Sequence, residues 1–170
     1  MLLAMAAWAS PAFVAGARTC VGERYDAGYH AGGPPPRGRG ACPEVPYYAF
    51  KAIGRNLQKE VNADIRRQPG GYPLLRDDNI DYRWCPNLIV WFRRHTRAVL
   101  DWQPGDVVFW SLTGDGVADH VGVVSDRKAG ARYLVIHNFP PACTEDDSLG
   151  RWAVVGHFRL PPSARPSSAR

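Results

Sequence analysis

The spacing of apolar residues changes near residue 100, and this change constrains the fold more than any other feature of the chain. Before it, apolar residues recur every three or four positions, as they do on one face of an α-helix. After it, short apolar runs alternate with turns that contain Gly and Asp, as in neighbouring β-strands. Helices followed by strands predict an α+β fold, with N-terminal helices packed on an antiparallel β-sheet.

Three helices are expected before the change. The first follows Cys42 and has an apolar face of residues spaced three or four apart, namely Val45, Tyr48, Ala49, Ala52 and Ile53. The second covers 56–67, with Asn56 as its N-cap. The third runs from Pro86 to about His95, because proline suits the first turn of a helix.

Four strands are expected after the change, over residues 107–110, 120–124, 133–137 and 152–160. The stretches 18–40 and 68–83 are rich in Pro, Gly and polar residues and are predicted to be loops. The first of these loops delivers the chain to Cys42.

The first seventeen residues carry no charged side chain. They are too few for a transmembrane helix, which needs about 20 apolar residues. They end in Ala15-Gly16-Ala17, a small-x-small triplet of the type that signal peptidase cleaves. We therefore predict a signal peptide over 1–17, a single domain over 18–160 and a disordered tail over 161–170. The mature protein would be periplasmic or secreted, with no membrane span. No Lys or Arg precedes the apolar run, so a buried strand or helix is the alternative.

The formal net charge is +5. A basic surface favours anionic partners such as cell-wall polymers, lipid headgroups or nucleic acid. The alternative is a charge-biased surface with no specific partner. No motif combines aromatic and basic residues as nucleic-acid binders do, so no nucleic-acid partner is expected.

The four cysteines stand at positions 20, 42, 85 and 143, and none forms a Cys-x-x-Cys pair. A zinc ribbon or thioredoxin-like motif is therefore not expected. The chain also lacks a His-Glu-x-x-His motif, and we predict neither a metal site nor a cofactor. If one of the four is a catalytic thiol, two of the other three could form a disulfide in an exported protein, and the sequence leaves the pair open.

Three residues form an ordered candidate set for catalysis. Cys42 stands at a predicted helix start, where free N–H groups and the helix dipole favour a nucleophilic thiolate. His120 opens a predicted strand and is the expected general base. His137 ends the next strand and would orient the ring of His120. Asn138 is the alternative for that role, but strand alternation favours His137.

Further polar residues are candidates for substrate binding. Asp81 and Arg83 lie in a polar turn, where arginine suits a carboxylate through its two-pronged donors; a structural ion pair is the alternative. Asp119, next to His120, and Asn138 complete this predicted set. His157 is expected to be a hydrogen-bonded strand histidine.

The order and setting of these residues resemble those of NlpC-type amidase domains, which are relatives of papain, and in particular the bacterial family called domain of unknown function 1287. The resemblance spans about residues 25–160 and rests on Gly40-Ala41-Cys42, Leu57-Gln58-Lys59, Asn79-Ile80-Asp81-Tyr82-Arg83, Pro86-Asn87-Leu88, Gln103-Pro104-Gly105-Asp106, His120-Val121-Gly122-Val123-Val124-Ser125-Asp126, Ile136-His137-Asn138, Glu145-Asp146 and Gly156-His157-Phe158-Arg159. The chain departs from the family pattern at Pro43-Glu44, at Cys85 and at Phe139-Pro140-Pro141.

The resemblance implies a papain-like fold and a cysteine peptidase or amidase site made of Cys42, His120 and His137. It also implies a role at the cell envelope, because many NlpC-type enzymes cut amide bonds in peptidoglycan stem peptides. The predicted function is therefore an exported cysteine hydrolase whose substrate is peptidoglycan or a peptide. The alternative is an inactive papain-like module that binds an anionic envelope polymer or a partner protein.

Overall fold

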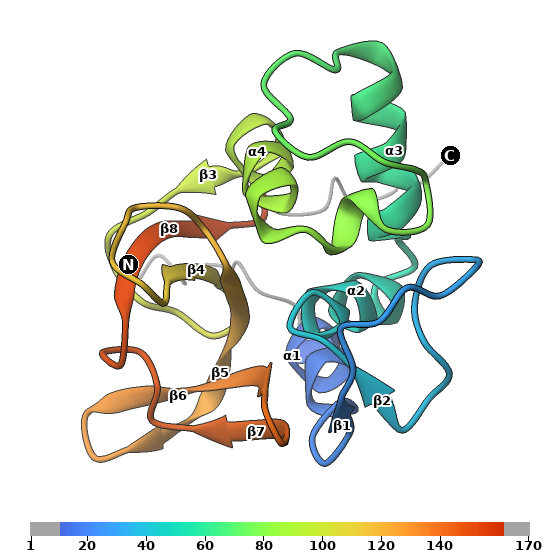
Figure 1. The fold of residues 1–170 in the computed structure, drawn as a ribbon. Helices are drawn as coiled ribbons and strands as arrows, with labels where there is room; N and C mark the ends of the chain where they lie inside the picture. The colour runs from blue at the N-terminus through green and yellow to red at the C-terminus, as the bar shows by residue number, and fades with distance from the viewer. Residues whose placement is uncertain (1–10, 162–170) are drawn as a thin grey trace, which may run out of the picture.

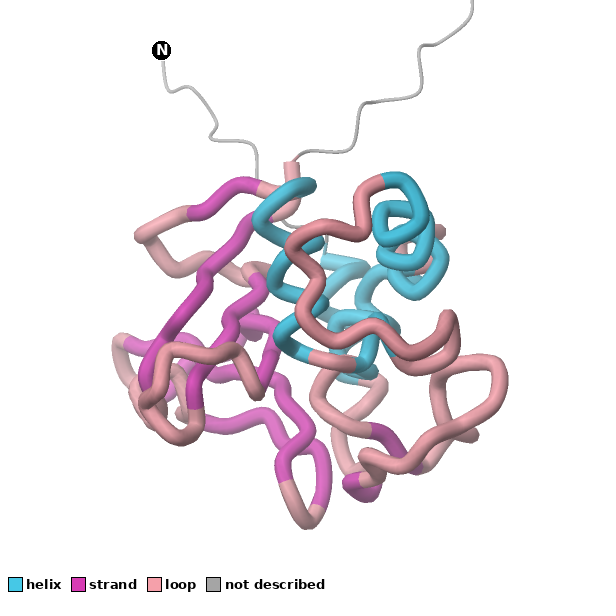
Figure 2. The backbone as a smooth tube through the Cα atoms, turned by 45° about the horizontal axis from the view of Figure 1, so that its top comes forward, coloured by secondary structure: helices cyan, strands magenta, loops and turns pink. Residues whose placement is uncertain are grey.

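The computed structural model describes residues 11–161, which form four α-helices and one curled eight-stranded sheet (Figure 1). The helices are α1 (Pro11–Arg18), α2 (Glu44–Ala52), α3 (Leu57–Arg67) and α4 (Cys85–His95), with a 3₁₀ helix, η1, at Asp81–Arg83. The strands are β1 (Arg24–Tyr25), β2 (Arg39–Gly40), β3 (Arg97–Ala98), β4 (Val107–Ser111), β5 (His120–Ala129), β6 (Arg132–Phe139), β7 (Ala142–Asp146) and β8 (Ala153–Arg159). The helices gather on one side of the molecule and the strands on the other (Figure 2), which confirms the predicted α+β class.

The sheet has the strand order β2-β1-β7-β6-β5-β4-β8-β3. Its neighbours are antiparallel except for the short edge pair β1 and β2, which is parallel. The register places Trp110 opposite His120, and Gly122 opposite His137. His120 and His137 are therefore diagonal neighbours on one face of the sheet, within side-chain reach of each other.

The three predicted helices are α2, α3 and α4. Asn56 caps α3 as expected, because its side chain accepts a hydrogen bond of 3.0 Å from the Lys59 backbone N–H. Helix α2 begins at Glu44, so Cys42 lies just ahead of the helix. The four predicted strands are β4, β5, β6 and β8. The sequence does not predict the two-residue strands β1, β2 and β3, since runs of two residues carry no periodicity. The five-residue strand β7 was also missed.

The main core lies between the helices and one face of the sheet. It contains, among others, Val45, Phe50, Leu57, Val61, Leu88 and Phe92 from the helices and Phe109, Val121, Val123 and Ile136 from the strands. A smaller cluster on the other face of the sheet contains Val108, Trp110, Val124, Val135 and Leu149. The predicted alternation in β6 is thus confirmed, with Ile136 in the main core and Val135 in the other cluster.

Helix α1 includes residues 11–17 of the segment predicted to be a signal peptide. Residues 1–10 of that segment lie outside the described part of the chain. The Phe13 ring packs edge-on against Phe50 at 5.4 Å between centroids, and Ala17 is fully buried. Gly16 lies so close to α2 that a Cβ there would stand 2.5 Å from the Cβ of Ala52. Residues of α1 thus belong to the main core. Cleavage after Ala17 stays a prediction, and it would remove this helix.

All four cysteines are free and buried, so the structure contains none of the disulfides that the sequence left open. Within residues 11–161, no helix combines the length and the apolar character needed to cross a bilayer. The predicted tail lies, from residue 162 onward, outside the described part of the chain.

Candidate active site

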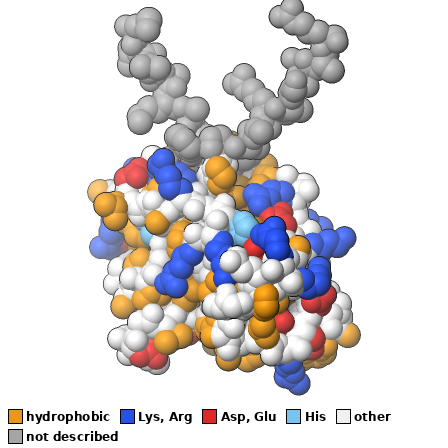
Figure 3. Space-filling model, turned by 90° about the horizontal axis from the view of Figure 1, so that it is seen from above, with side chains coloured by type: hydrophobic (Ala, Val, Ile, Leu, Met, Phe, Trp, Pro, Cys, Tyr) orange, Lys and Arg blue, Asp and Glu red, His pale blue; other side chains and the backbone are white. Residues whose placement is uncertain are grey.

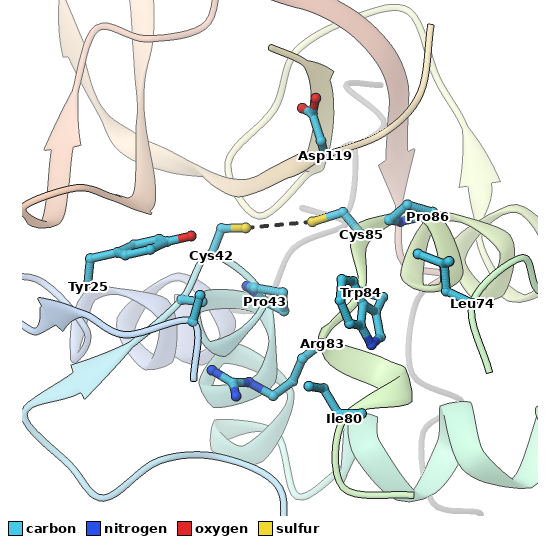
Figure 4. A pocket seen from close by; sticks show the side chains of 12 residues that line it. Tyr25, Cys42, Pro43, Leu74, Ile80, Arg83, Trp84, Cys85, Pro86 and Asp119 are labelled. Carbon is cyan, nitrogen blue, oxygen red and sulfur yellow. Dashed lines mark hydrogen bonds between the residues drawn. The ribbon is translucent and has the colours of Figure 1, made fainter. Parts of the chain in front are cut away.

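A cavity of about 310 Å³ opens where the starts of α2 and α4 meet the loops around β1 and β5. Cys42 lies on its surface with only 6% of its area exposed, and the sulfur points toward Cys85 (Figure 4). The other lining side chains are Tyr25, Ala27, Ala41, Pro43, Leu74, Ile80, Arg83, Trp84, Pro86 and Asp119. Most of these side chains are apolar, and the cavity is large enough for one or two amino-acid side chains of a substrate.

The turn between β2 and α2 positions Cys42. Gly40 allows this turn to pack closely, because a Cβ there would lie 3.1 Å from the Cβ of Glu44. The Asn138 side-chain amide donates a hydrogen bond of 2.8 Å to the Gly40 carbonyl and so ties the turn to β6. The turn that carries Cys42 is therefore held by contacts from the sheet as well as from α2.

His120 supports the thiolate form of Cys42. The pKa of Cys42 lies well below its ordinary value because Cys85 donates a hydrogen bond to it, while burial opposes the shift. The charge and a hydrogen bond of His120, and the Val121 backbone N–H, lower it further. The His120 ring is itself fixed by stacking on Trp110, at 5.5 Å between centroids and 27° between planes. Cys42 is thus poised as a nucleophile.

His137 lies behind His120, as the sequence predicted. Its Nδ1 is 2.8 Å from Nε2 of His120. Its Nε2 lies 3.0 Å from the Ser148 hydroxyl and 3.2 Å from a carboxylate oxygen of Asp146. Burial, followed by the charge of His120, lowers the pKa of His137, so this ring is neutral at neutral pH.

One arrangement of protons leaves His120 able to act as a base. Since His137 occupies Nε2 of His120, Nδ1 is the nitrogen left to face the thiol. His120 then donates from Nε2 to Nδ1 of His137, and His137 donates from Nε2 to Asp146. The orienting group thus fixes the tautomer of the base. Sequence reasoning gave no role to Asp146 or Ser148, although Glu145-Asp146 is part of the pattern that carries the family resemblance.

Cys85 is a third residue that the sequence did not assign to the site. It is the first residue of α4, and its sulfur lies 3.6 Å from that of Cys42. The pKa of Cys85 is raised well above its ordinary value, chiefly because it donates a hydrogen bond to Cys42 and because it is buried. Cys85 therefore remains a protonated thiol beside the thiolate.

The predicted substrate-binding residues do not all reach the cavity. Arg83 lines it, but the guanidinium forms a buried ion pair with Glu44 at 2.8 Å and donates to backbone carbonyls of the β1 loop. Asp119 lines the cavity while accepting a hydrogen bond of 2.8 Å from the Leu112 N–H. Asp81 instead accepts from the N–H groups of Arg76 and Asp77, which fixes the turn before η1. Asn138 supports the Cys42 turn and does not line the cavity.

His157 is hydrogen-bonded, as expected: its Nε2 lies 2.7 Å from Asp106, and its ring stacks on Trp102. It lies on β8, outside the lining of the Cys42 cavity.

Comparison with known proteins places the chain in a family. Residues 14–160 match the family described as domain of unknown function (DUF1287). The uncharacterised protein YijF of Escherichia coli strain K12 is 40% identical over 162 residues, which cover 85% of this chain and 78% of YijF. A solved Staphylococcus aureus protein, described as similar to a lipoprotein of the NLP/P60 family, is similar over 88% of this chain at 17% identity and a TM-score of 0.49. The chain spans 40% of that protein's length. By its sequence over nearly the whole domain, the chain belongs to the DUF1287 family.

Proposed function

We propose that the protein is a cysteine hydrolase of the cell envelope that cleaves amide bonds of peptidoglycan stem peptides. The observation that carries the proposal is the continuous chain of contacts from Cys42 through His120 and His137 to Asp146. It supplies a nucleophile, a base and a group that orients the base, which are the parts that acyl transfer needs.

In the acylation step, the Cys42 thiolate attacks the carbonyl carbon of the amide. The nitrogen of the substrate leaves as an amine after it takes the proton held at Nδ1 of His120. A thioester remains on Cys42. His120, neutral again, removes a proton from water, and the resulting hydroxide attacks the thioester to release the acid and restore the thiolate.

Two donors are available for the oxyanion that forms in each step. Residues 41–45 contain one backbone N–H without a partner, that of Cys42; Ala41, Glu44 and Val45 donate within the turn, and Pro43 has no N–H. The Tyr25 side chain points toward Cys42 from the opposite wall (Figure 4). Burial and the charge of Cys42 raise the pKa of Tyr25, so its hydroxyl stays protonated and can donate. Such donors stabilise the charge that develops in the transition state.

The lining of the cavity supports a peptide substrate. Leu74, Ile80 and Trp84 offer apolar contacts, and Asp119 offers a carboxylate to an amide or ammonium group. The surface carries many Lys and Arg side chains on the face seen in Figure 3, which suits an anionic polymer such as peptidoglycan. The resemblance of the sequence to NlpC-type amidases points to the same substrate class.

The proposal is tested by incubating the purified protein with muropeptides and identifying the products by mass spectrometry. Cys42→Ala is the test variant. Cys20→Ala is the matched control, because Cys20 is a buried thiol outside the lining of the cavity. The protein and the control are expected to release the same fragments, whose masses name the cleaved bond, and Cys42→Ala to release none. Equal product from Cys42→Ala would remove Cys42 from the mechanism and favour a binding module.

A further inference from the structure

Two thiols face each other across the candidate site. The sulfurs of Cys42 and Cys85 lie 3.6 Å apart and point toward each other (Figure 4). They come from two different elements, since Cys42 precedes α2 and Cys85 opens α4, and 43 positions separate them in the sequence. Only 6% of Cys42 and 5% of Cys85 is exposed, yet both line the cavity, so a small oxidant in the cavity reaches both sulfurs.

We propose that Cys42 and Cys85 form a reversible disulfide that switches the site off under oxidation and protects the nucleophile from irreversible damage. The inference rests on the proposed function, because it regulates the same nucleophile. A disulfide needs the two sulfurs to approach from 3.6 Å to about 2 Å, a movement of side-chain size.

The oxidant is a hydroperoxide, and the reaction proceeds in two steps. First, the Cys42 thiolate attacks one peroxide oxygen; the O–O bond breaks, and Cys42 becomes a sulfenic acid while hydroxide leaves and is protonated to water. Second, the Cys85 sulfur attacks the sulfenic sulfur; the S–S bond forms, the S–O bond breaks and a second water leaves with the Cys85 proton. In sum, two thiols and one hydrogen peroxide give one disulfide and two waters.

The electrostatics of the pair favour this order of events. Cys42 is the thiolate, and Cys85 is held as a thiol by its hydrogen bond to Cys42, by burial and by the Cys42 charge. Oxidation of Cys42 to a neutral sulfenic acid removes that negative charge. The pKa of Cys85 then falls, so the second thiol gains nucleophilic character only after the first has been oxidised.

The other two cysteines provide an internal comparison. Burial raises the pKa of Cys20 to about 12, and it raises that of Cys143 as well. Neither residue lines the cavity. Thiols of this kind are poor targets for peroxide, so oxidation is expected to be confined to the Cys42–Cys85 pair.

The test uses the reduced full-length protein treated with hydrogen peroxide, blocked with iodoacetamide and digested with trypsin without reduction. We expect one linked product, in which the peptide 40–51 is joined to the peptide 84–93. Dithiothreitol is expected to restore Cys42 to a thiol. In Cys85→Ala, and in Cys85→Ser as the variant of nearly equal size, no linked product forms. Cys42 then advances to sulfinic or sulfonic acid, which dithiothreitol does not reverse. Cys20→Ala is expected to behave like the unsubstituted protein.

Two results would overturn the inference. One is the absence of the linked peptides after peroxide treatment of the unsubstituted protein. The other is equal recovery of the Cys42 thiol in that protein and in both Cys85 variants. The same samples, assayed with muropeptides, separate the two proposals. Linked peptides from a protein that cleaves nothing when reduced would reject the hydrolase and leave the disulfide assigned, whereas cleavage without linked peptides would reject the disulfide alone.

Discussion

His120 and His137 share a hydrogen bond in which Nε2 of the first ring lies 2.8 Å from Nδ1 of the second, and both rings are buried. This contact decides which nitrogen of His120 can act on Cys42. His137 in turn contacts Asp146 and Ser148 through its other nitrogen. The position of the proton near the thiol therefore depends on residues at the end of β7.

The role of His137 is tested by two substitutions of different chemistry. His137→Leu removes the acceptor for the Nε2–H of His120, whereas His137→Asn keeps a polar group near the position of Nδ1. We expect kcat to be roughly 10²–10⁴-fold lower in the leucine variant, the range for loss of acid–base function. The asparagine variant is expected to have a higher kcat than the leucine variant. KM is expected to change little. If both variants lose kcat equally and lose thermal stability together, His137 is structural and does not orient the base.

The reactivity of Cys42 toward iodoacetamide should extend to lower pH than that of an ordinary thiol. The pKa of Cys42 is lowered by the hydrogen bond from Cys85 and by His120, so the thiolate persists as the pH falls below the range of free cysteine. Cys85→Ala removes the first donor. In this variant the pKa of Cys42 should rise, and the pH profile of Cys42 alkylation should move toward alkaline pH. Cys20→Ala is the control and should leave the profile in place; an unmoved profile in Cys85→Ala would show that Cys85 does not stabilise the thiolate.

The buried ion pair of Glu44 and Arg83 should dominate stability near the site. Both side chains are almost fully buried, and the N–O distance is 2.8 Å. Arg83→Met leaves a buried carboxylate without its partner, and we expect the free energy of unfolding to fall by roughly 3–5 kcal/mol. The matched control is Arg66→Met, whose ion pair with Asp78 has the same 2.8 Å distance but is well exposed. That change should cost at most about 1 kcal/mol. Urea unfolding measures the free energy of unfolding of both variants. Similar losses in the two would show that the buried ion pair contributes no more to stability than the exposed one.

Helix α1 should be required for folding. A chain that starts at Arg18 loses Phe13 and Val14 from the core, and each large apolar side chain contributes roughly 1.5–3 kcal/mol when fully buried. A chain that starts at Pro11 keeps them. We expect the Pro11 form to unfold cooperatively on heating and the Arg18 form to melt at a much lower temperature or not to fold. Equal melting temperatures would show that residues 11–17 are dispensable, as expected for a cleaved leader.

Local pattern predicted much of the architecture. The helical spacing around Val45 and the alternation around Val135 depend on neighbouring residues alone, so the order of helices and strands could be read from the chain. The setting of Cys42 before a helix and of His120 at a strand start followed from the same patterns. The short strands at the edge of the sheet could not be found in this way, because they exist only where a distant strand pairs with them.

The residues of the candidate site also divide into those that local pattern revealed and those that depend on contacts between distant parts of the chain. Residue type and position in a local element were enough to single out Cys42, His120 and His137. For Arg83 the sequence left open a substrate contact or a structural ion pair. Its guanidinium is held by Glu44, which lies 39 positions away in the chain. Asp146 and Ser148 gained a role only because β6 and β7 pair in the register that brings them to His137.

The sequence by itself determined the α+β order of elements and singled out the three residues that we propose as catalytic, since both depend on side-chain type and short-range spacing. Only the tertiary structure decided that α1 belongs to the core, that Asp146 ends the histidine chain and that Cys85 stands against Cys42. Those three results depend on how elements far apart in the chain pack together, and packing is set by the shape and burial of the whole core.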